Sequence, residues 1–121
     1  MAVTILPGLE GFFPIDITTT GRRTGAARRI EIAIHPIDGR YYISGMPSRR
    51  TRAWIHNLEA DPRLTLHVKQ PGVARDLAAT ARVITDEAER REIMPRIAAR
   101  WHRDDIDRMV AYSPLIEVTL D

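Results

Sequence analysis

An alternating strand pattern followed by a tight-turn signal constrains the fold more than any other feature of the chain. In the segment 29–35 the isoleucines occupy every second position and share one face, which is the period of a half-buried β-strand. Asp38-Gly39 follows, a dipeptide that favours a two-residue hairpin turn, and residues 40–44 then return as the partner strand. The chain is therefore expected to build its sheet from antiparallel hairpins.

The other apolar segments predict four further strands, at 15–20, 64–68, 73–84 and 115–120. Glycine and proline mark turns between them, at Gly21–Gly25 and at Pro71-Gly72. Too few strands alternate with helices to form a parallel sheet. A small antiparallel barrel would also leave no long unpaired strand edge.

Two segments have helical character. Residues 48–60 predict a helix that Pro62 ends, and a second helix is expected to begin with Thr85 as its cap and acidic residues in its first turn. Pro95 predicts either a kink in this second helix or the start of a third. The chain is thus expected to be mostly β (α+β), a split β-barrel of about six antiparallel strands with two or three helices, in a single domain spanning residues 1–121.

The composition of the chain excludes several classes of protein and of site. The chain has no cysteine, so disulfides, thiolate nucleophiles and thiolate metal sites are excluded. The four histidines show none of the spacings of a metal site, and no Ser-His-acid arrangement indicates hydrolysis. No apolar run approaches the roughly 18 residues that cross a bilayer, and residues 1–11 lack the pattern of a signal peptide. The protein is expected to be cytoplasmic, without a metal or a transmembrane segment.

Positive charge is concentrated in one part of the chain. The net charge is only +2, yet residues 18–56 hold eight arginines and two acids, a local charge of +6. The planar guanidinium suits two-point contacts with phosphate or carboxylate. Aromatic residues make up only 6% of the chain and are not interleaved with these arginines, which argues against a platform for single-stranded nucleic acid.

Two motifs lie in this basic segment. Residues 18–28 read TTTGRRTGAAR, a tight turn whose amides and arginines could form an anion cradle or an ordinary surface hairpin. Residues 44–58 read SGMPSRRTRAWIHNL, where a flexible pair leaves a strand and feeds a helix start whose free amides could bind an anion or the carbonyls of a planar ring. Trp54 could stack on such a ring, although a core position is the commoner role for a helical tryptophan.

The segments ITTTGRRTGAAR, DGRYYIS and AWIHNLEADPRL together resemble the deazaflavin-dependent nitroreductase family, and the resemblance extends over roughly Ile15 to Val118. Members of this family are split β-barrel oxidoreductases. The resemblance implies that the chain binds reduced coenzyme F420, a deazaflavin that carries a phosphate and a polyglutamate tail. It also implies hydride transfer to an electrophilic small-molecule acceptor such as an enone or a quinone.

The resemblance further implies which residues form the site. In the family, basic residues after the Thr-Thr-Gly turn hold the phosphate and tail, the next strand-to-helix loop lies along the ring, and the following helix packs beside the cofactor. The predicted cofactor-binding residues are therefore Arg22, Arg23, Thr24, Gly25, Arg28, Ser44, Gly45, Met46, Pro47, Ser48, Trp54 and Asn57. Ser44, or an amide of its loop, is the predicted catalytic group because it could polarise the acceptor or the ring.

Two departures limit what the resemblance implies. Nitroreductase members carry tyrosines before the last strand, where this chain reads WHRDDID, and their glycine-rich ring loop here reads GMPS. Nitroimidazole reduction is therefore not implied, and quinone reduction is only weakly implied.

Three alternatives remain open from the sequence. The barrel could hold FMN or haem in place of the deazaflavin, it could carry the deazaflavin without turnover, or it could be a non-catalytic module that binds nucleic acid. Related split barrels pair across their sheets, so a homodimer is expected by analogy.

Overall fold

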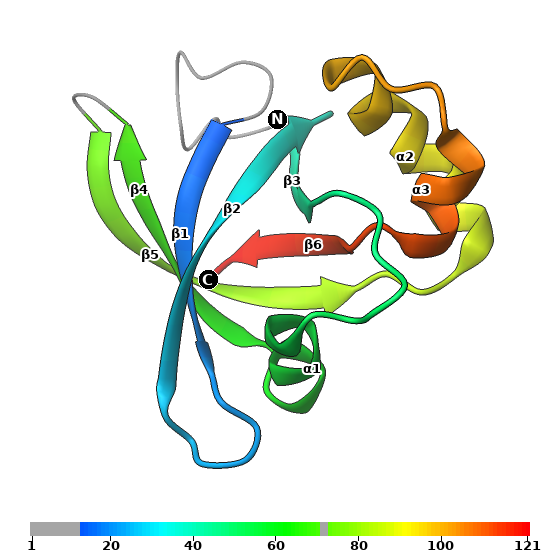
Figure 1. Ribbon diagram of the computed structural model, residues 1–121. Coiled ribbons are helices and arrows are strands. Elements are labelled where there is room, and N and C mark those ends of the chain that lie inside the picture. The colour runs from blue at the N-terminus through cyan, green and yellow to red at the C-terminus, as the bar shows by residue number, and fades with distance from the viewer. Residues whose placement is uncertain (1–12, 71–72) are drawn as a thin grey trace.

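The computed structural model describes residues 13–70 and 73–121. Six antiparallel strands close into a barrel in the order β1-β2-β3-β6-β5-β4 (Figure 1). The strands are β1 (Phe13–Thr20), β2 (Ala27–Ile37), β3 (Arg40–Ser44), β4 (Arg63–Gln70), β5 (Val73–Val83) and β6 (Leu115–Leu120). The helices are α1 (Ala53–Ala60), α2 (Glu87–Arg100) and α3 (Ile106–Tyr112). The predicted fold class is confirmed, while the predicted turn at Pro71-Gly72 lies outside the described residues.

Strand β2 is longer than its neighbour β3. Ile34 pairs with Phe13 on one side and with Ile43 on the other, inside the barrel. Ile30 and Ile32 lie on the same face of β2 but are only half-buried, because β3 pairs only with residues 33–37 of β2 and does not reach this part of the strand. The alternation of isoleucines therefore fills the core at one end of β2 and leaves an apolar strip at the other.

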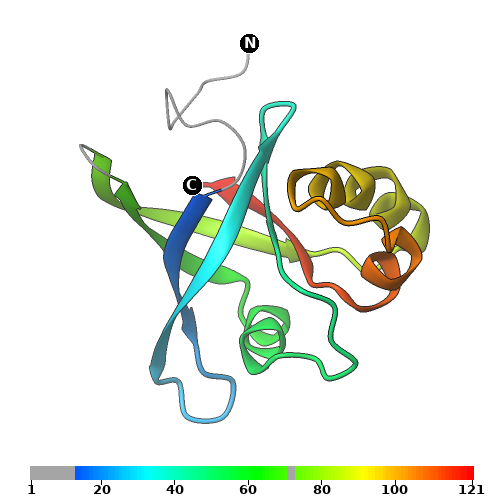
Figure 2. The ribbon, with the colours of Figure 1, turned by 45° about the horizontal axis from the view of Figure 1, so that its top comes forward.

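The core is divided into two clusters. The first fills the barrel, and Ile55 and Leu58 of α1 belong to it. The second lies outside the barrel, where α2 and α3 pack together against one side (Figure 2). Adjacent residues of β6 serve both clusters, since Leu115 faces the helices and Ile116 faces the barrel interior.

The first helix is shorter than predicted. The sequence predicts a helix from Ser48, but α1 begins at Ala53 and residues 45–52 form a loop. The Ser48 amide donates to the Tyr112 carbonyl at 3.0 Å, and the Ser48 hydroxyl donates to the Arg50 carbonyl at 3.0 Å. These bonds tie the loop to α3 and to itself, and the helix begins only after it.

The expected cap of α2 and the expected start of a third helix at Pro95 are wrong. Asp86, rather than Thr85, caps the helix, and its carboxylate accepts from the Glu89 amide at 2.9 Å. Pro95 does not start another helix, because it lies inside α2, which runs from Glu87 to Arg100. An interior proline costs about 3 kcal/mol, and here the neighbouring apolar residues compensate by packing against the barrel, namely Ile93, Met94, Ile97 and Ala98.

Among residues 13–70 and 73–121, no helix combines the length and the apolar character needed to cross a bilayer. In the same part of the chain, no cluster of three or more histidine or acidic side chains could hold a metal ion.

Candidate functional site

The turn between β1 and β2 is fixed by short-range hydrogen bonds. The Gly21 amide donates to the Ala26 carbonyl and the Gly25 amide donates to the Gly21 carbonyl, both at 2.8 Å. Gly25 has a φ of +73°, which favours glycine. A Cβ on Gly21 would lie 3.0 Å from the Ala26 carbonyl oxygen. The two glycines therefore permit a compact turn that holds its arginines in defined positions.

Asn57 joins this turn to α1. Its side chain is buried, with Nδ2 donating to Thr19 Oγ1 at 3.3 Å and Oδ1 accepting from the Arg22 amide at 3.1 Å. A buried side-chain amide whose oxygen and nitrogen both form hydrogen bonds holds its partners in one geometry. Asn57 thus sets the distance between the turn and the helix.

A cleft of about 460 Å³ lies between the turn and α1. This turn cleft is lined by Gly21, Arg22, Arg23, Thr24, Arg28, Ile30, Ala53, Trp54 and Asn57. The structure therefore brings six of the predicted cofactor-binding residues together in one cleft. One side is basic and the other is an apolar wall that includes Ile30 and Trp54.

The arginines of the turn cleft differ from those that form ion pairs elsewhere on the surface. Arg29 contacts Asp16 at 3.0 Å, Arg63 contacts Asp61 at 2.8 Å and Arg82 contacts Glu89 at 2.7 Å. Three arginines of the turn cleft, by contrast, are exposed and have no carboxylate partner among the described residues, namely Arg22, Arg23 and Arg28. The cleft therefore carries positive charge that the protein itself does not neutralise.

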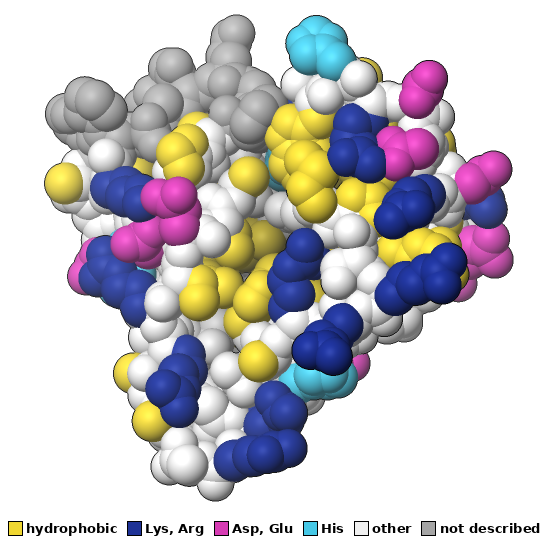
Figure 3. Space-filling view, viewed as in Figure 1, with side chains coloured by type: hydrophobic (Ala, Val, Ile, Leu, Met, Phe, Trp, Pro, Cys, Tyr) yellow, Lys and Arg dark blue, Asp and Glu magenta, His cyan; other side chains and the backbone are white. Residues whose placement is uncertain are grey.

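A second pocket, of about 290 Å³, adjoins the turn cleft. This loop pocket is lined by Glu31, Ile32, Ala33, Ser44, Gly45, Met46, Arg52, Trp54, Trp101 and Pro114. Trp54 lines both spaces. Figure 3 shows hydrophobic side chains exposed in a central hollow of this face, with basic side chains around it. The two spaces together offer an apolar floor beside a cationic rim.

Ser44 lies in this pocket but its hydroxyl is already engaged. The residue is buried, and its Oγ donates to the Pro114 carbonyl at 2.6 Å. That bond joins the end of β3 to the start of β6. Because the proton of the hydroxyl is used there, this geometry does not favour the predicted role of the Ser44 side chain in polarising an acceptor.

The other predicted residues divide between the two spaces and their surroundings. Gly45 and Met46 line the loop pocket, whereas Ser48 faces a different cavity on the opposite side of α1. Gly25 and Pro47 line neither the turn cleft nor the loop pocket.

The sequence did not single out Arg52 and Trp101 as site residues, although both line the loop pocket. Arg52 Nη2 donates to the Met46 carbonyl at 2.9 Å, which holds the guanidinium against the loop. The only sequence signal for Arg52 is its place in the basic segment, and Trp101 appears only in the WHRDDID segment that departs from the family pattern.

The His35 ring packs against Trp101. The two rings meet edge to face with centroids 5.0 Å apart, and His35 is fully buried. Burial, and secondarily the charge of Arg100, lowers the pKa of His35 to about 4. The imidazole is therefore neutral near pH 7 and contributes to packing of the pocket wall.

Several solved structures share this fold. One described as an F420-H2 dependent reductase (FDR-A) has 20% identity and a TM-score of 0.54, with 88% of this chain and 93% of that chain covered. HutZ, the heme storage protein from Vibrio cholerae, has 12% identity and a TM-score of 0.66, with 89% and 81% covered. One described as a domain-swapped dimer has 20% identity and a TM-score of 0.57, with 88% and 79% covered. At these identities the likeness shows the fold alone, and no curated protein matches the chain.

A family model gives the assignment that fold alone does not. The model described as F420H(2)-dependent quinone reductase matches residues 4–114. The site fits coenzyme F420, because the unpaired arginines of the turn cleft suit a phosphate and an anionic tail and the adjoining apolar surface suits a planar ring. The chain belongs to the F420H(2)-dependent quinone reductase family and is an F420-dependent reductase.

Proposed function

We propose that the turn cleft holds the phosphate and tail of F420 while the loop pocket receives the ring and an organic acceptor. The observation that carries this proposal is the group of three arginines without carboxylate partners that borders an apolar wall. A polyanion with a planar head needs both features side by side. Trp54 lines both spaces, so one ligand can occupy the two together.

Each residue of the turn cleft has a defined task in this proposal. Arg22, Arg23 and Arg28 supply charge-assisted hydrogen bonds to the anionic groups. Thr24 Oγ1 accepts from the Ala26 amide at 3.2 Å, which helps to hold the turn. Asn57 acts as a positioning residue, because it fixes the turn against α1.

The loop pocket supplies orientation and electrostatics for the reduction. When bound, reduced F420 supplies a hydride for an electrophilic carbon of the acceptor, such as an enone or a quinone. The acceptor oxygen then gains negative charge, and we assign its stabilisation to the Arg52 guanidinium and to loop amides at Gly45 and Met46. Ser44 is reassigned as a positioning residue, since its bond to Pro114 shapes this loop.

The lining of the loop pocket favours a flat, weakly polar acceptor. Trp101 and Trp54 offer aromatic surface, and Ile32 adds an apolar side chain. These groups exclude water and bury the body of a quinone or enone, which strengthens every charge interaction in the pocket. The family description, a quinone reductase, supports the same class of acceptor.

Turnover distinguishes this enzyme from a carrier. Steady-state oxidation of reduced F420 is followed by absorbance with a panel of benzoquinones, naphthoquinones and cyclic enones. We expect at least one quinone or enone to be reduced in proportion to enzyme concentration. Tight F420 binding with no acceptor turned over across the panel would instead identify a carrier.

We also propose that the protein forms a homodimer, since one structural neighbour is described as a domain-swapped dimer. Light scattering coupled to size-exclusion chromatography is expected to give twice the 13.7 kDa chain mass. The mass of a single chain at micromolar concentration would contradict this.

A further inference from the structure

A cavity of about 510 Å³ lies on the opposite side of α1 from the turn cleft. The two spaces use different faces of the helix, with Ala53, Trp54 and Asn57 lining the turn cleft and Ile55, His56 and Glu59 lining this one. We call it the α1–β6 cavity, since Leu115 and Ile116 of β6 form part of its wall. Its volume is within the usual range for small-molecule sites, roughly 300–1,000 Å³.

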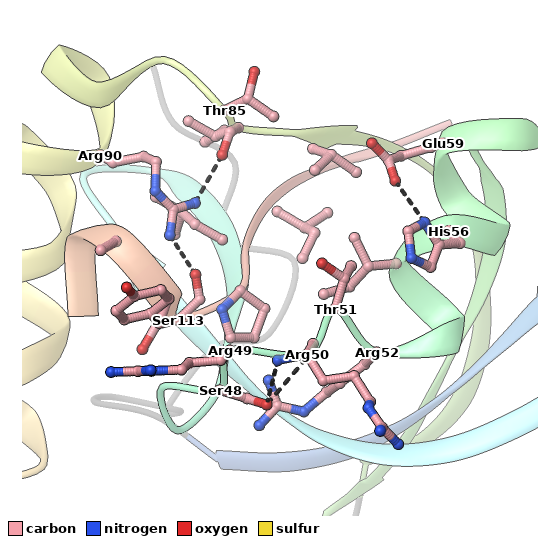
Figure 4. Close-up of a pocket in the computed structure, with 18 residues that line it drawn as sticks. Ser48, Arg49, Arg50, Thr51, Arg52, His56, Glu59, Thr85, Arg90 and Ser113 are labelled. Atoms are coloured by element: carbon pink, nitrogen blue, oxygen red, sulfur yellow. Dashed lines mark hydrogen bonds and ion pairs between the residues drawn. The ribbon is translucent and has the colours of Figure 1, made fainter. Parts of the chain in front are cut away.

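One wall of the α1–β6 cavity is the loop that precedes α1. Arg49, Arg50 and Arg52 line it (Figure 4), and none of the three has a carboxylate partner among the described residues. Arg52 also lines the loop pocket, where it donates to the Met46 carbonyl, so Arg49 and Arg50 are the loop arginines that belong to this cavity alone. The Arg49 guanidinium lies 5.8 Å from the centroid of the Tyr112 ring, a cation–π distance that restricts its position. This wall therefore presents clustered positive charge that the protein does not neutralise.

The facing wall adds a fourth arginine. Arg90 is half-buried and donates to the carbonyls of Val110 at 2.7 Å and Ile84 at 2.8 Å, and it also bonds the Ser113 carbonyl. Figure 4 places it across the cavity from the loop arginines. Burial lowers the pKa of Arg90, because carbonyls satisfy its N–H groups but do not cancel its charge. An anion in the cavity would offset this cost.

The remaining lining is mostly apolar. Ile55, Ile84, Leu115 and Ile116 are buried side chains that border the space. The one carboxylate in the lining, Glu59, lies 3.3 Å from the imidazole of His56 on its own helix. The cavity therefore joins an apolar floor to a basic rim, and its acid does not pair with the arginines.

We infer that the α1–β6 cavity is a binding site for an organic carboxylate with an apolar body, distinct from the turn cleft and bordering the loop pocket at Arg52 and Pro114. The carboxylate lies against Arg49 and Arg50, where two-point guanidinium contacts are available. The body lies against the accessible apolar lining of Val83, Ala111 and Tyr112, and burial of this surface together with the ligand's own supplies the affinity that the exposed arginines alone would not.

The test is a calorimetric titration of 2-naphthoate into protein saturated with F420, so that the turn cleft and loop pocket are filled. We expect 2-naphthoate to bind with one site per chain. The double variant Arg49→Ala/Arg50→Ala should weaken binding at least tenfold. Arg75→Ala, which removes an exposed arginine outside both sites, is the matched control and should stay within twofold of the wild type.

Two further ligands test the charged head and the apolar body of 2-naphthoate separately. Inorganic phosphate carries only a charged head and 2-naphthol only an apolar body, and each should bind at least tenfold more weakly than 2-naphthoate. Ala111→Trp places a large side chain at an exposed lining position and should block 2-naphthoate without loss of the folded state, as checked by circular dichroism.

Absence of 2-naphthoate binding to the F420-saturated protein overturns the inference. So does binding that Arg49→Ala/Arg50→Ala leaves unchanged, or phosphate binding as tight as that of 2-naphthoate. If F420 itself fails to bind, the same titration on the unloaded chain still tests the cavity, with Arg23→Ala/Arg28→Ala expected to leave 2-naphthoate binding intact. Failure of the proposed function and failure of this inference therefore give different results.

Discussion

The two sides of α1 present basic clefts that are built in different ways. On one side, the arginines of the turn cleft project from a hairpin turn that Asn57 fixes to the helix. On the other, three arginines of the α1–β6 cavity lie on a loop, and Arg90 lies on a packed helix. Both groups lack carboxylate partners among the described residues. Arginines elsewhere are mostly paired with acids, as Arg82 is with Glu89.

This contrast indicates where charge serves ligands and where it serves the surface. An exposed ion pair contributes little to stability, typically 0–1 kcal/mol, but it removes a cation from use by a ligand. Arginines left unpaired beside an apolar wall remain available to an anion. The two clefts therefore differ in the elements that carry their arginines and in chain position rather than in charge.

If the basic clefts serve ligands rather than folding, the loss of stability in mild acid should come from the core. The pKa of His35 is lowered from 6.5 to about 4 by burial and by Arg100, so the unfolded chain binds a proton in this range that the folded protein does not. The contribution of neutral His35 to the free energy of unfolding should be fully present above pH 6.5. The free energy of unfolding should then fall by roughly 2–3 kcal/mol between pH 6.5 and pH 4.

Urea unfolding at a series of pH values measures this. His35→Gln should flatten the slope in that window, while Arg23→Ala/Arg28→Ala should keep it. Stability that does not change between pH 6.5 and 4 would show that the His35 assignment is wrong. Carboxylates with lowered pKa values, such as Asp61 at about 2, lose their contribution only at lower pH.

Replacement of Asn57 tests whether F420 binding depends on the fixed geometry of the turn cleft. Asn57→Ala removes both buried hydrogen bonds, and we expect the free energy of unfolding to fall by about 1–3 kcal/mol. F420 affinity should also fall, because the turn loses its fixed distance from α1, whereas 2-naphthoate binding in the α1–β6 cavity should change less. Thermal unfolding and parallel titrations measure the two effects. An unchanged F420 affinity in a stably folded variant would contradict the positioning role.

The dependence of F420 affinity on salt concentration is a further test of the turn-cleft arginines. Exposed arginines are screened by ions, so F420 binding should weaken roughly tenfold between 50 and 500 mM sodium chloride. Arg23→Ala/Arg28→Ala should show a much shallower dependence, because the charges that salt screens are gone. Equal slopes for the wild type and the variant would place the anion contacts elsewhere.

The smallest effect is expected at Ser44. Ser44→Ala removes the bond to the Pro114 carbonyl and should lower the free energy of unfolding by about 1 kcal/mol. Turnover at saturating acceptor should stay within about threefold of the wild type if the hydroxyl only positions the loop. Loss of turnover by two or more orders of magnitude, with F420 affinity retained, would restore Ser44 as a catalytic residue.

The hairpin architecture could be predicted because it depends on local signals. Alternating isoleucines and Asp38-Gly39 specify β2, its turn and β3 without reference to distant residues. The basic turn and the Trp-x-x-Asn pattern likewise fall within short segments, and the structure brings Arg23, Trp54 and Asn57 into one cleft.

What could not be predicted depends on contacts between distant segments. The start of α1 is set by the bond from Ser48 to Tyr112, and the hydroxyl of Ser44 is taken by Pro114. Trp101 enters the loop pocket from the end of α2. No local pattern indicates any of these, because the bonding partners of Ser48 and Ser44 lie more than 60 residues away in the chain and Trp101 meets residues from several distant segments.

The most direct test of the central claim is a crossed fluorescence titration with F420. The wild type, Arg23→Ala/Arg28→Ala, Arg49→Ala/Arg50→Ala and Arg75→Ala are titrated under the same conditions at low salt. We expect each arginine removed from the turn cleft to cost about 10- to 100-fold in affinity, so that Arg23→Ala/Arg28→Ala binds F420 at least about 100-fold more weakly than the wild type. The other two variants should change by less than about threefold. Equal F420 affinity in all four proteins would contradict the account.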